Sequence, residues 1–151
     1  WAADEISDEV LADKVSSLIE EKDGARGFFA VSLSSDSPLM DRLPDPLVMK
    51  LRAAGKTVID LTVRNLAMSS AMSIHHQRNK DYEMKEGSIR VKKRCQELLR
   101  LLEPNEVKET LERFLKATKG IGDEIHFLER WNYDDAQKTE IALSINAVAE
   151  N

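Results

Sequence analysis

The feature that most constrains this chain is the stretch from Thr57 to Pro104, which holds one glycine, Gly87, and no proline before its last residue. Glycine and proline are the residues that most often end a helix, so their scarcity predicts a long central helix. The first half of the stretch is apolar and rich in small residues, whereas the second half is heavily charged. We therefore expect a helix that is buried in its first half and exposed in its second. The sequence leaves open whether Gly87 breaks it.

The rest of the chain also carries helix signals. Ser7 is expected to cap a first helix that Gly24 ends. The segment Phe28–Leu33 is expected to form a short buried helix, because its alternating pattern would permit a strand but no other segment offers a partner strand. A turn-rich loop follows at residues 35–46. Further helices are expected to begin at Asp45, Asn105, Asp123 and Asp134.

Length and composition favour a single helical domain. The chain has 151 residues, of which 42% are hydrophobic and only 5% aromatic. This length suits one domain, and the scarcity of aromatic residues favours helix over sheet. We predict a flexible acidic N-terminus at residues 1–6 and one all-α domain at residues 7–151, a bundle of six to seven helices around the long helix. No apolar run approaches the roughly 20 residues that span a bilayer, so a soluble protein is expected.

A phosphate-binding loop is the first chemical motif to consider. Gly55-Lys56-Thr57 resembles the end of such a loop, but Lys50 stands where the complete motif needs a glycine. The motif also follows a strand, whereas the sequence here is typical of a helix. We therefore interpret Gly55 as the end of one helix, directly before the start of the next.

The histidines and the cysteine do not form a recognisable catalytic or metal site. His75 and His76 are adjacent, so on a helix they point about 100° apart, and His126 has no partner at the spacing of a zinc helix. Cys95, the single cysteine, lies on an apolar stripe with Met84 and is expected to be packed in the core. A redox-active thiol is the alternative, because basic neighbours could lower its pKa if it were exposed. We predict no catalytic residue, no metal and no cofactor.

The charged half of the long stretch is the best candidate for a binding surface. Residues 78–100 hold eight basic and four acidic side chains, whereas residues 1–23 hold eight acidic side chains and two lysines. This asymmetry favours an acidic protein partner, with docking of the acidic arm or a solvated helix face as alternatives. The net charge of −5 and the absence of interleaved aromatics argue against nucleic acid. The residues expected to contact the partner are Arg90, Lys92, Lys93, Arg94, His75, His76 and Arg78.

The segment Ala67–Ser73 has a different character. It places alanines and serines four residues apart, which lets another helix approach closely. Met68 and Met72 between them can fill gaps in a core or make adaptable contacts with a partner. We expect this segment to lie in the core, and a partner groove is the alternative.

Three segments, GARGFFAVSL, VRNLAMSSAMSIHHQRN and FLERWNYDDAQK, resemble a family of small soluble helical proteins found in chloroplasts and cyanobacteria, to which no reaction is assigned. The resemblance covers most of residues 24–145. It implies a location in the chloroplast stroma and an auxiliary role in the biogenesis of the photosynthetic machinery. It also implies that a transit peptide was removed before Trp1, where a domain boundary is the alternative.

Together these observations favour a non-enzymatic protein-binding factor that assembles or stabilises a photosynthesis-related plastid complex. One alternative is a ligand-binding or enzymatic bundle with an interhelical pocket near His126, Trp131 and Tyr133. Another is a structural subunit of a larger assembly. The sequence does not identify the partner or the oligomeric state.

Overall fold

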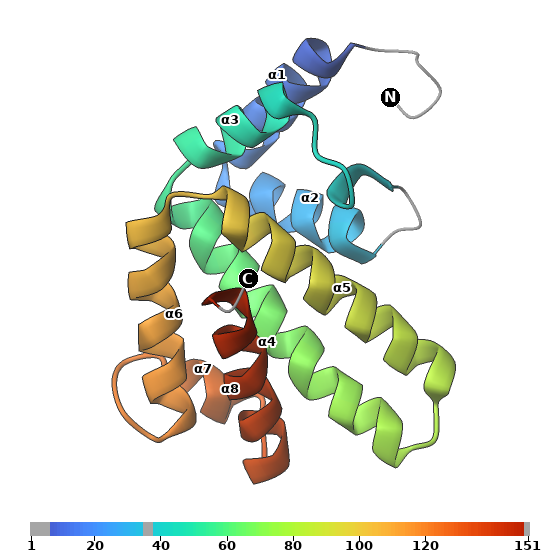
Figure 1. Cartoon of the computed structure of the whole chain (residues 1–151), viewed down its shortest axis with the longest axis vertical. Helices are drawn as coiled ribbons and strands as arrows, with labels where there is room; N and C mark the ends of the chain where they lie inside the picture. The colour runs from blue at the N-terminus through green and yellow to red at the C-terminus, as the bar shows by residue number, and fades with distance from the viewer. Residues whose placement is uncertain (1–6, 35–37, 150–151) are drawn as a thin grey trace.

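The computed structural model describes residues 7–34 and 38–149, which fold into helices without a strand (Figure 1). The elements in chain order are α1 (Asp8–Ile19), α2 (Lys22–Ser34), the short 3₁₀ helix η1 (Pro38–Met40), α3 (Asp45–Ala53), α4 (Lys56–Arg78), α5 (Tyr82–Leu101), α6 (Pro104–Thr118), α7 (Ile125–Arg130) and α8 (Asp135–Ala149). The all-α prediction is confirmed, with eight α-helices in the described residues. The N-terminal segment at residues 1–6 lies outside them. None of the helices described is long and apolar enough to cross a bilayer.

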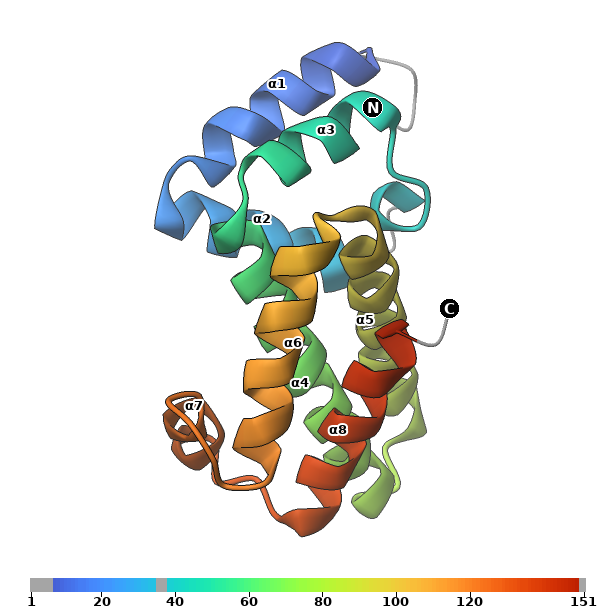
Figure 2. The same ribbon diagram turned by 60° about the vertical axis from the view of Figure 1, so that its left-hand side comes forward.

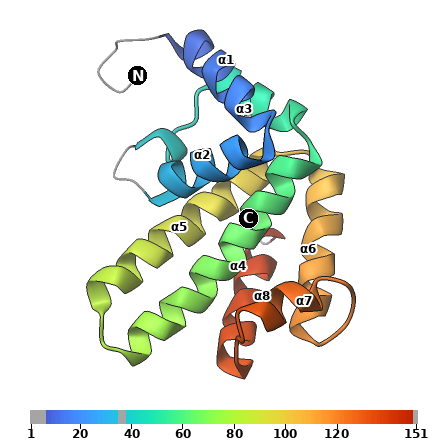
Figure 3. The same ribbon diagram turned by 180° about the vertical axis from the view of Figure 1, so that it is seen from behind.

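The long stretch folds as a hairpin of two helices, and the prediction of one continuous helix is wrong. α4 and α5 run antiparallel and side by side, joined by a tight turn (Figures 1 and 3). The break falls at residues 79–81, and Gly87 lies inside α5. The hairpin therefore places the charged second half of the stretch against its apolar first half.

Hydrogen bonds at both helix ends build this turn without a glycine or a proline. The Asp81 N–H donates to the carbonyl of His76 at 2.9 Å, and the Lys80 N–H donates to the carbonyl of Gln77 at 3.1 Å. This pair of bonds is a Schellman motif, and it requires the left-handed conformation that Lys80 adopts at φ 58°. The Asp81 carboxylate then accepts from the Met84 N–H at 3.3 Å and caps α5.

The alanines and serines of the segment Ala67–Ser73 are buried, as the sequence predicts, and Ser70 lies at the seam between α4 and α8. Met68 is only partly buried and Met72 is exposed. Ser70 is fully buried, and its hydroxyl lies 2.8 Å from that of Ser144 on α8. The Ser70 hydroxyl also donates to the carbonyl of Leu66 at 2.7 Å. Small side chains thus let the two helices approach closely, and the two serine hydroxyls form a hydrogen bond across the seam.

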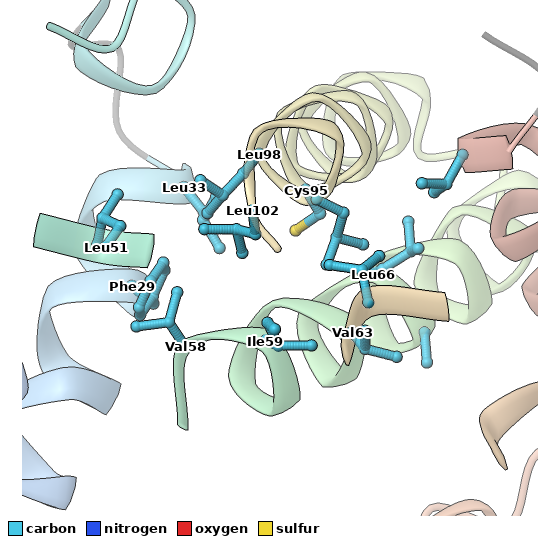
Figure 4. Packing of buried hydrophobic residues seen from close by; sticks show 14 of the residues in the cluster. Phe29, Leu33, Leu51, Val58, Ile59, Val63, Leu66, Cys95, Leu98 and Leu102 are labelled. Atoms are coloured by element: carbon cyan, nitrogen blue, oxygen red, sulfur yellow. The ribbon is translucent and has the colours of Figure 1, made fainter. Parts of the chain in front are cut away.

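The core runs through all eight α-helices, and part of it lies where α2, α3, α4 and α5 converge. Figure 4 shows Phe29 and Leu33 of α2 with Leu51 of α3, opposite the residues of α4 and α5. Cys95 points into this cluster and is fully buried, which confirms the prediction that it packs in the core. Burial raises the pKa of its thiol far above the ordinary value, because the thiolate would be desolvated.

α1 and α3 pack together at one end of the molecule, where α2 connects them to the hairpin (Figure 2). Ser7 caps α1, as predicted, by accepting from the Val10 N–H at 3.2 Å. Gly24 does not end this helix. It lies inside α2, where an added Cβ would meet the carbonyl oxygen of Leu18 at 2.2 Å. The glycine is therefore needed for the close approach of α2 to α1.

The sequence predicts the N-cap of α8 correctly and the N-cap of α6 incorrectly. Glu103, not Asn105, caps α6 by accepting from the Glu106 N–H at 2.8 Å. The helix starts earlier than expected because Pro104 suits the first helical position, where its missing N–H costs nothing. Asp134 caps α8 as predicted, and it exchanges two hydrogen bonds with Gln137 in a capping box.

Candidate functional site

The basic run of α5 is divided among different faces of the helix. Successive residues of a helix point about 100° apart, so Arg90, Lys92, Lys93 and Arg94 cannot form one surface. Lys92 and Arg94 hold the bundle together through ion pairs, whereas the side chains of Arg90 and Lys93 are exposed.

Arg94 is buried, and the prediction that it lies on the exposed surface is wrong. Its guanidinium donates to both carboxylate oxygens of Asp41, at 2.9 and 3.0 Å, in the bidentate geometry that arginine favours. It also donates to the carbonyl of Leu33 at 2.9 Å. The hydrogen bond from Arg94 and its charge lower the pKa of Asp41, with a further contribution from Arg90. Arg94 therefore ties α5 to the end of α2 and to the segment after η1.

Lys92 lies on the opposite edge of α5 and contacts α8. Its ammonium lies 3.3 Å from Glu140, and the side chain is only 20% exposed. One helical turn later, Gln96 donates to the carbonyl of Ser144 at 3.0 Å. Arg100 donates to the carbonyls of Ala147 and Val148 at the end of α8. This edge of α5 is thus occupied within the molecule.

The predicted residues at the end of α4 also lie on two faces. Arg78 pairs with Asp134 at the start of α8, and this contact, together with the Gln137 N–H at the helix cap, lowers the pKa of Asp134. His75 is exposed, and His76 is half-buried. Their rings meet edge to face with centroids 5.4 Å apart, and His75 also contacts the side chain of Asn79. No group of three or more metal-ligating side chains gathers in the described residues.

A groove lies between α4 and α5 on the face that carries Arg90. It has a volume of about 440 Å³, and Met68 and Met72 of α4 and Met84 of α5 line it. Met84 is 54% exposed and Met72 37% exposed, so the placement of Met84 on the inward stripe is wrong. The groove is also lined by Ser34, Asn65, Ser69, Glu83, Gly87, Ser88, Arg90 and Val91.

Of the seven predicted contact residues, Arg90 lines this groove. Lys93 is exposed three residues later but is not part of the lining. His75 and His76 continue the α4 wall beyond Met72. The structure therefore brings Arg90, His75 and His76 to one side of the hairpin. Lys92, Arg94 and Arg78 form ion pairs with Glu140, Asp41 and Asp134.

The alternative pocket near His126 does not assemble from the three residues expected to form it. His126 lines a shallow hollow of about 310 Å³ with Arg64 and Arg130, but Trp131 and Tyr133 are not part of its lining. Burial raises the pKa of Tyr133 to about 12. Trp131 is exposed, and the guanidinium of Arg130 lies 6.0 Å from the centre of its ring.

The charged residues beside this hollow have a structural role. Glu124 accepts from Arg64 at 3.2 Å and lies 3.5 Å from Arg113, so one carboxylate links α4, α6 and the start of α7. Arg64 also lies over the rings of Phe114 and Phe127, at 5.6 and 5.0 Å.

A hollow of about 530 Å³ lies between α5, α6 and α8, and apolar side chains such as Leu99, Leu111 and Ile145 line it. Gly55 lies between α3 and α4 at φ 66°, which confirms that it ends one helix before the next. The sequence Gly55-Lys56-Thr57 therefore lies at a helix junction and does not follow a strand.

Sequence reasoning missed Met84 and Gly87 as residues of a site. The only available signal was the methionine content of the two helices, because the groove exists only once the chain turns at residues 79–81.

The model of the family described as Uncharacterised conserved protein UCP020893 matches residues 1–148. No curated protein and no solved structure matches the chain.

Proposed function

The chain belongs to the UCP020893 family, and we propose that it is a non-enzymatic protein that captures an acidic protein partner through the α4–α5 groove. The observation that carries this proposal is the groove itself, where partly exposed methionines lie beside Arg90. Methionine side chains are flexible and polarisable, and they are typical of surfaces that bind a partner helix or segment.

The charges around the groove support an acidic partner. Arg90 lines the groove, and His75 and His76 extend the wall of α4. Lys93 adds an exposed positive charge three residues further along α5. Basic groups at the rim steer an acidic surface toward the groove and fix its register. Glu83 lines the groove as well, so the partner also needs a donor or a basic group at that position.

We further propose that the protein works in the chloroplast stroma, where it assembles or stabilises a photosynthesis-related complex. The support for this location and role is the resemblance of the three sequence segments to a family of chloroplasts and cyanobacteria. The candidate surface consists of methionines and charged residues at its rim. These side chains suit protein binding better than catalysis, which supports a binding role over an enzymatic one.

Charge reversal at the groove tests the proposal. The variant Arg90→Glu/Lys93→Glu leaves Lys92 and Arg94 in place, because those residues hold the bundle together. We expect affinity purification from stroma to recover at least about tenfold less of an acidic partner with this variant than with the native chain. A photo-crosslinker at position 84 should attach to that same partner in the native chain.

The matched control is Lys108→Glu/Lys116→Glu on α6, which makes the same change in net charge at two exposed lysines. The control should retain the partner at the native level. Equal recovery with the groove variant, together with no crosslinked protein from position 84, would show that the surface lies elsewhere.

A further inference from the structure

We infer that the α4–α5 groove receives an α-helix of the partner, and that this helix crosses α5 directly over Gly87. The inference rests on the proposed function and specifies the shape and polarity of the segment that binds. It starts from a glycine that the fold of this chain does not require.

Gly87 lies inside the 20-residue helix α5, where glycine destabilises a helix relative to alanine. A Cβ added at Gly87 would meet no atom within 4 Å. The contrast with Gly24 is direct, because the carbonyl of Leu18 leaves no room for a Cβ at that position. No contact among residues 7–34 and 38–149 therefore explains the absence of a side chain at residue 87.

The position of Gly87 in the groove supplies an explanation. Gly87 and Ser88 line the α5 wall between Met84 and Val91, while Met68 and Met72 line the wall of α4. A helix that lies between two helices must bring its axis within about 8–10 Å of theirs, and small residues at the crossing point allow this. The methionines can then adjust to the side chains on either flank of the incoming helix.

The two charged residues of the lining define the polarity of this helix. Glu83 and Arg90 are seven residues apart on α5, or about two turns on one face, with Gly87 between them. The bound helix should therefore carry a basic residue near Glu83 and an acidic residue about two turns away near Arg90. Between them it should present alanine or another small residue to Gly87, flanked by leucines for the methionines.

A synthetic peptide with this pattern is the probe. It has about 20 residues, a length of about 30 Å as a helix, with alanine at the crossing point and one lysine and one glutamate seven residues apart. We expect saturable binding to the native chain, with amide chemical-shift changes confined to the groove. A peptide with glutamine in place of both charged residues should bind several-fold more weakly.

Glycine substitutions provide the decisive comparison. Gly87→Ala should raise Tm, because it favours the helix, yet weaken peptide binding several-fold, and Gly87→Leu should abolish binding. Gly27 is the matched control, since it lies inside α2 and a Cβ there also meets nothing within 4 Å. Gly27→Ala should raise Tm and leave binding unchanged.

The outcomes separate the two proposals. If the peptide does not bind the native chain, or binds Gly87→Leu with native affinity, the helix inference is wrong. If Gly87→Leu still captures the stromal partner while Arg90→Glu/Lys93→Glu does not, the proposed function stands and only the helix inference fails. If neither variant reduces partner capture, both proposals fail.

Discussion

At the scale of single residues, Arg94 shows how a side chain in a basic run becomes part of the core. Its neighbours Lys92 and Lys93 point to other faces, and its guanidinium reaches Asp41, which lies 53 residues earlier in the chain. The adjacent Cys95 is a sign of burial at this point of the helix. No local pattern in the sequence identifies Asp41 as the partner, because the contact depends on how α2 and η1 pack on α5.

The first prediction concerns the pair of Arg94 and Asp41. Asp41→Asn removes the charge that faces a buried guanidinium, and we expect a loss of about 1 kcal/mol in the free energy of unfolding at pH 7. The loss is modest because the Asp41 carboxylate is half exposed and therefore screened by water. Urea unfolding measures it, and Asp123→Asn, at an exposed carboxylate, should change the midpoint little.

The contribution of the Arg94–Asp41 pair to the free energy of unfolding depends on pH. The pKa of Asp41 is lower in the folded chain than its ordinary value of about 3.9, so its contribution to stability is complete above that value. The contribution is lost as the pH falls through the folded pKa. The native chain and Asp41→Asn should therefore converge in stability below about pH 4, and a constant difference down to pH 2 would contradict this account.

At the scale of helices, local sequence signals predict most helix starts correctly and several helix ends incorrectly. Ser7 and Asp134 cap their helices as expected, since a side-chain acceptor before an apolar run acts locally. Gly24 is expected to end the first helix, and the sequence leaves open a break at Gly87, yet both glycines lie inside helices. The real break at Lys80 has no glycine, because the Schellman bonds and the Asp81 cap stabilise a left-handed lysine. The left-handed conformation is unfavourable for lysine, and the hydrogen bonds on both sides of Lys80 outweigh this cost.

A prediction for the contact between α1 and α2 follows from Gly24. Gly24→Ala places a methyl group 2.2 Å from the carbonyl oxygen of Leu18, so the two helices must separate. We expect a loss of about 2 kcal/mol or more, although alanine favours a helix intrinsically. Thermal unfolding measures the effect, with Gly27→Ala as the comparison that should gain stability. Equal Tm shifts for the two variants would show that α1 and α2 do not approach closely.

At the scale of the whole molecule, α4 is the axis around which the other helices pack. It contacts α5, α6, α8 and α2, which explains why small and apolar residues surround it on several sides. The apolar and small residues in the first half of the long stretch predict that it is buried. Its partners could not be predicted, because Ser144 carries no sign in the sequence that it meets Ser70. The same applies to the groove, whose methionines come together only in the folded hairpin.

The seam between α4 and α8 gives the prediction at this scale. Ser70→Leu adds a large side chain where Ser144 lies 2.8 Å away, and we expect a loss of about 3 kcal/mol as α8 is displaced. Ser70→Ala should cost about 1 kcal/mol, since it removes only hydrogen bonds. Hydrogen exchange should show faster exchange in α8 for Ser70→Leu, whereas Ser17→Leu on the surface of α1 should leave α8 unchanged.

The complete burial of Cys95 has a practical consequence. A thiol reagent can reach this sulfur only when the helices around it separate. The rate of alkylation under native conditions therefore depends on the opening of the core. Because the chain has one cysteine, every modified molecule records one such event. When closing is fast relative to alkylation, the rate reports the free energy of opening, without denaturant and at trace concentration. The alkylation rate of Cys95 therefore measures the stability of the core.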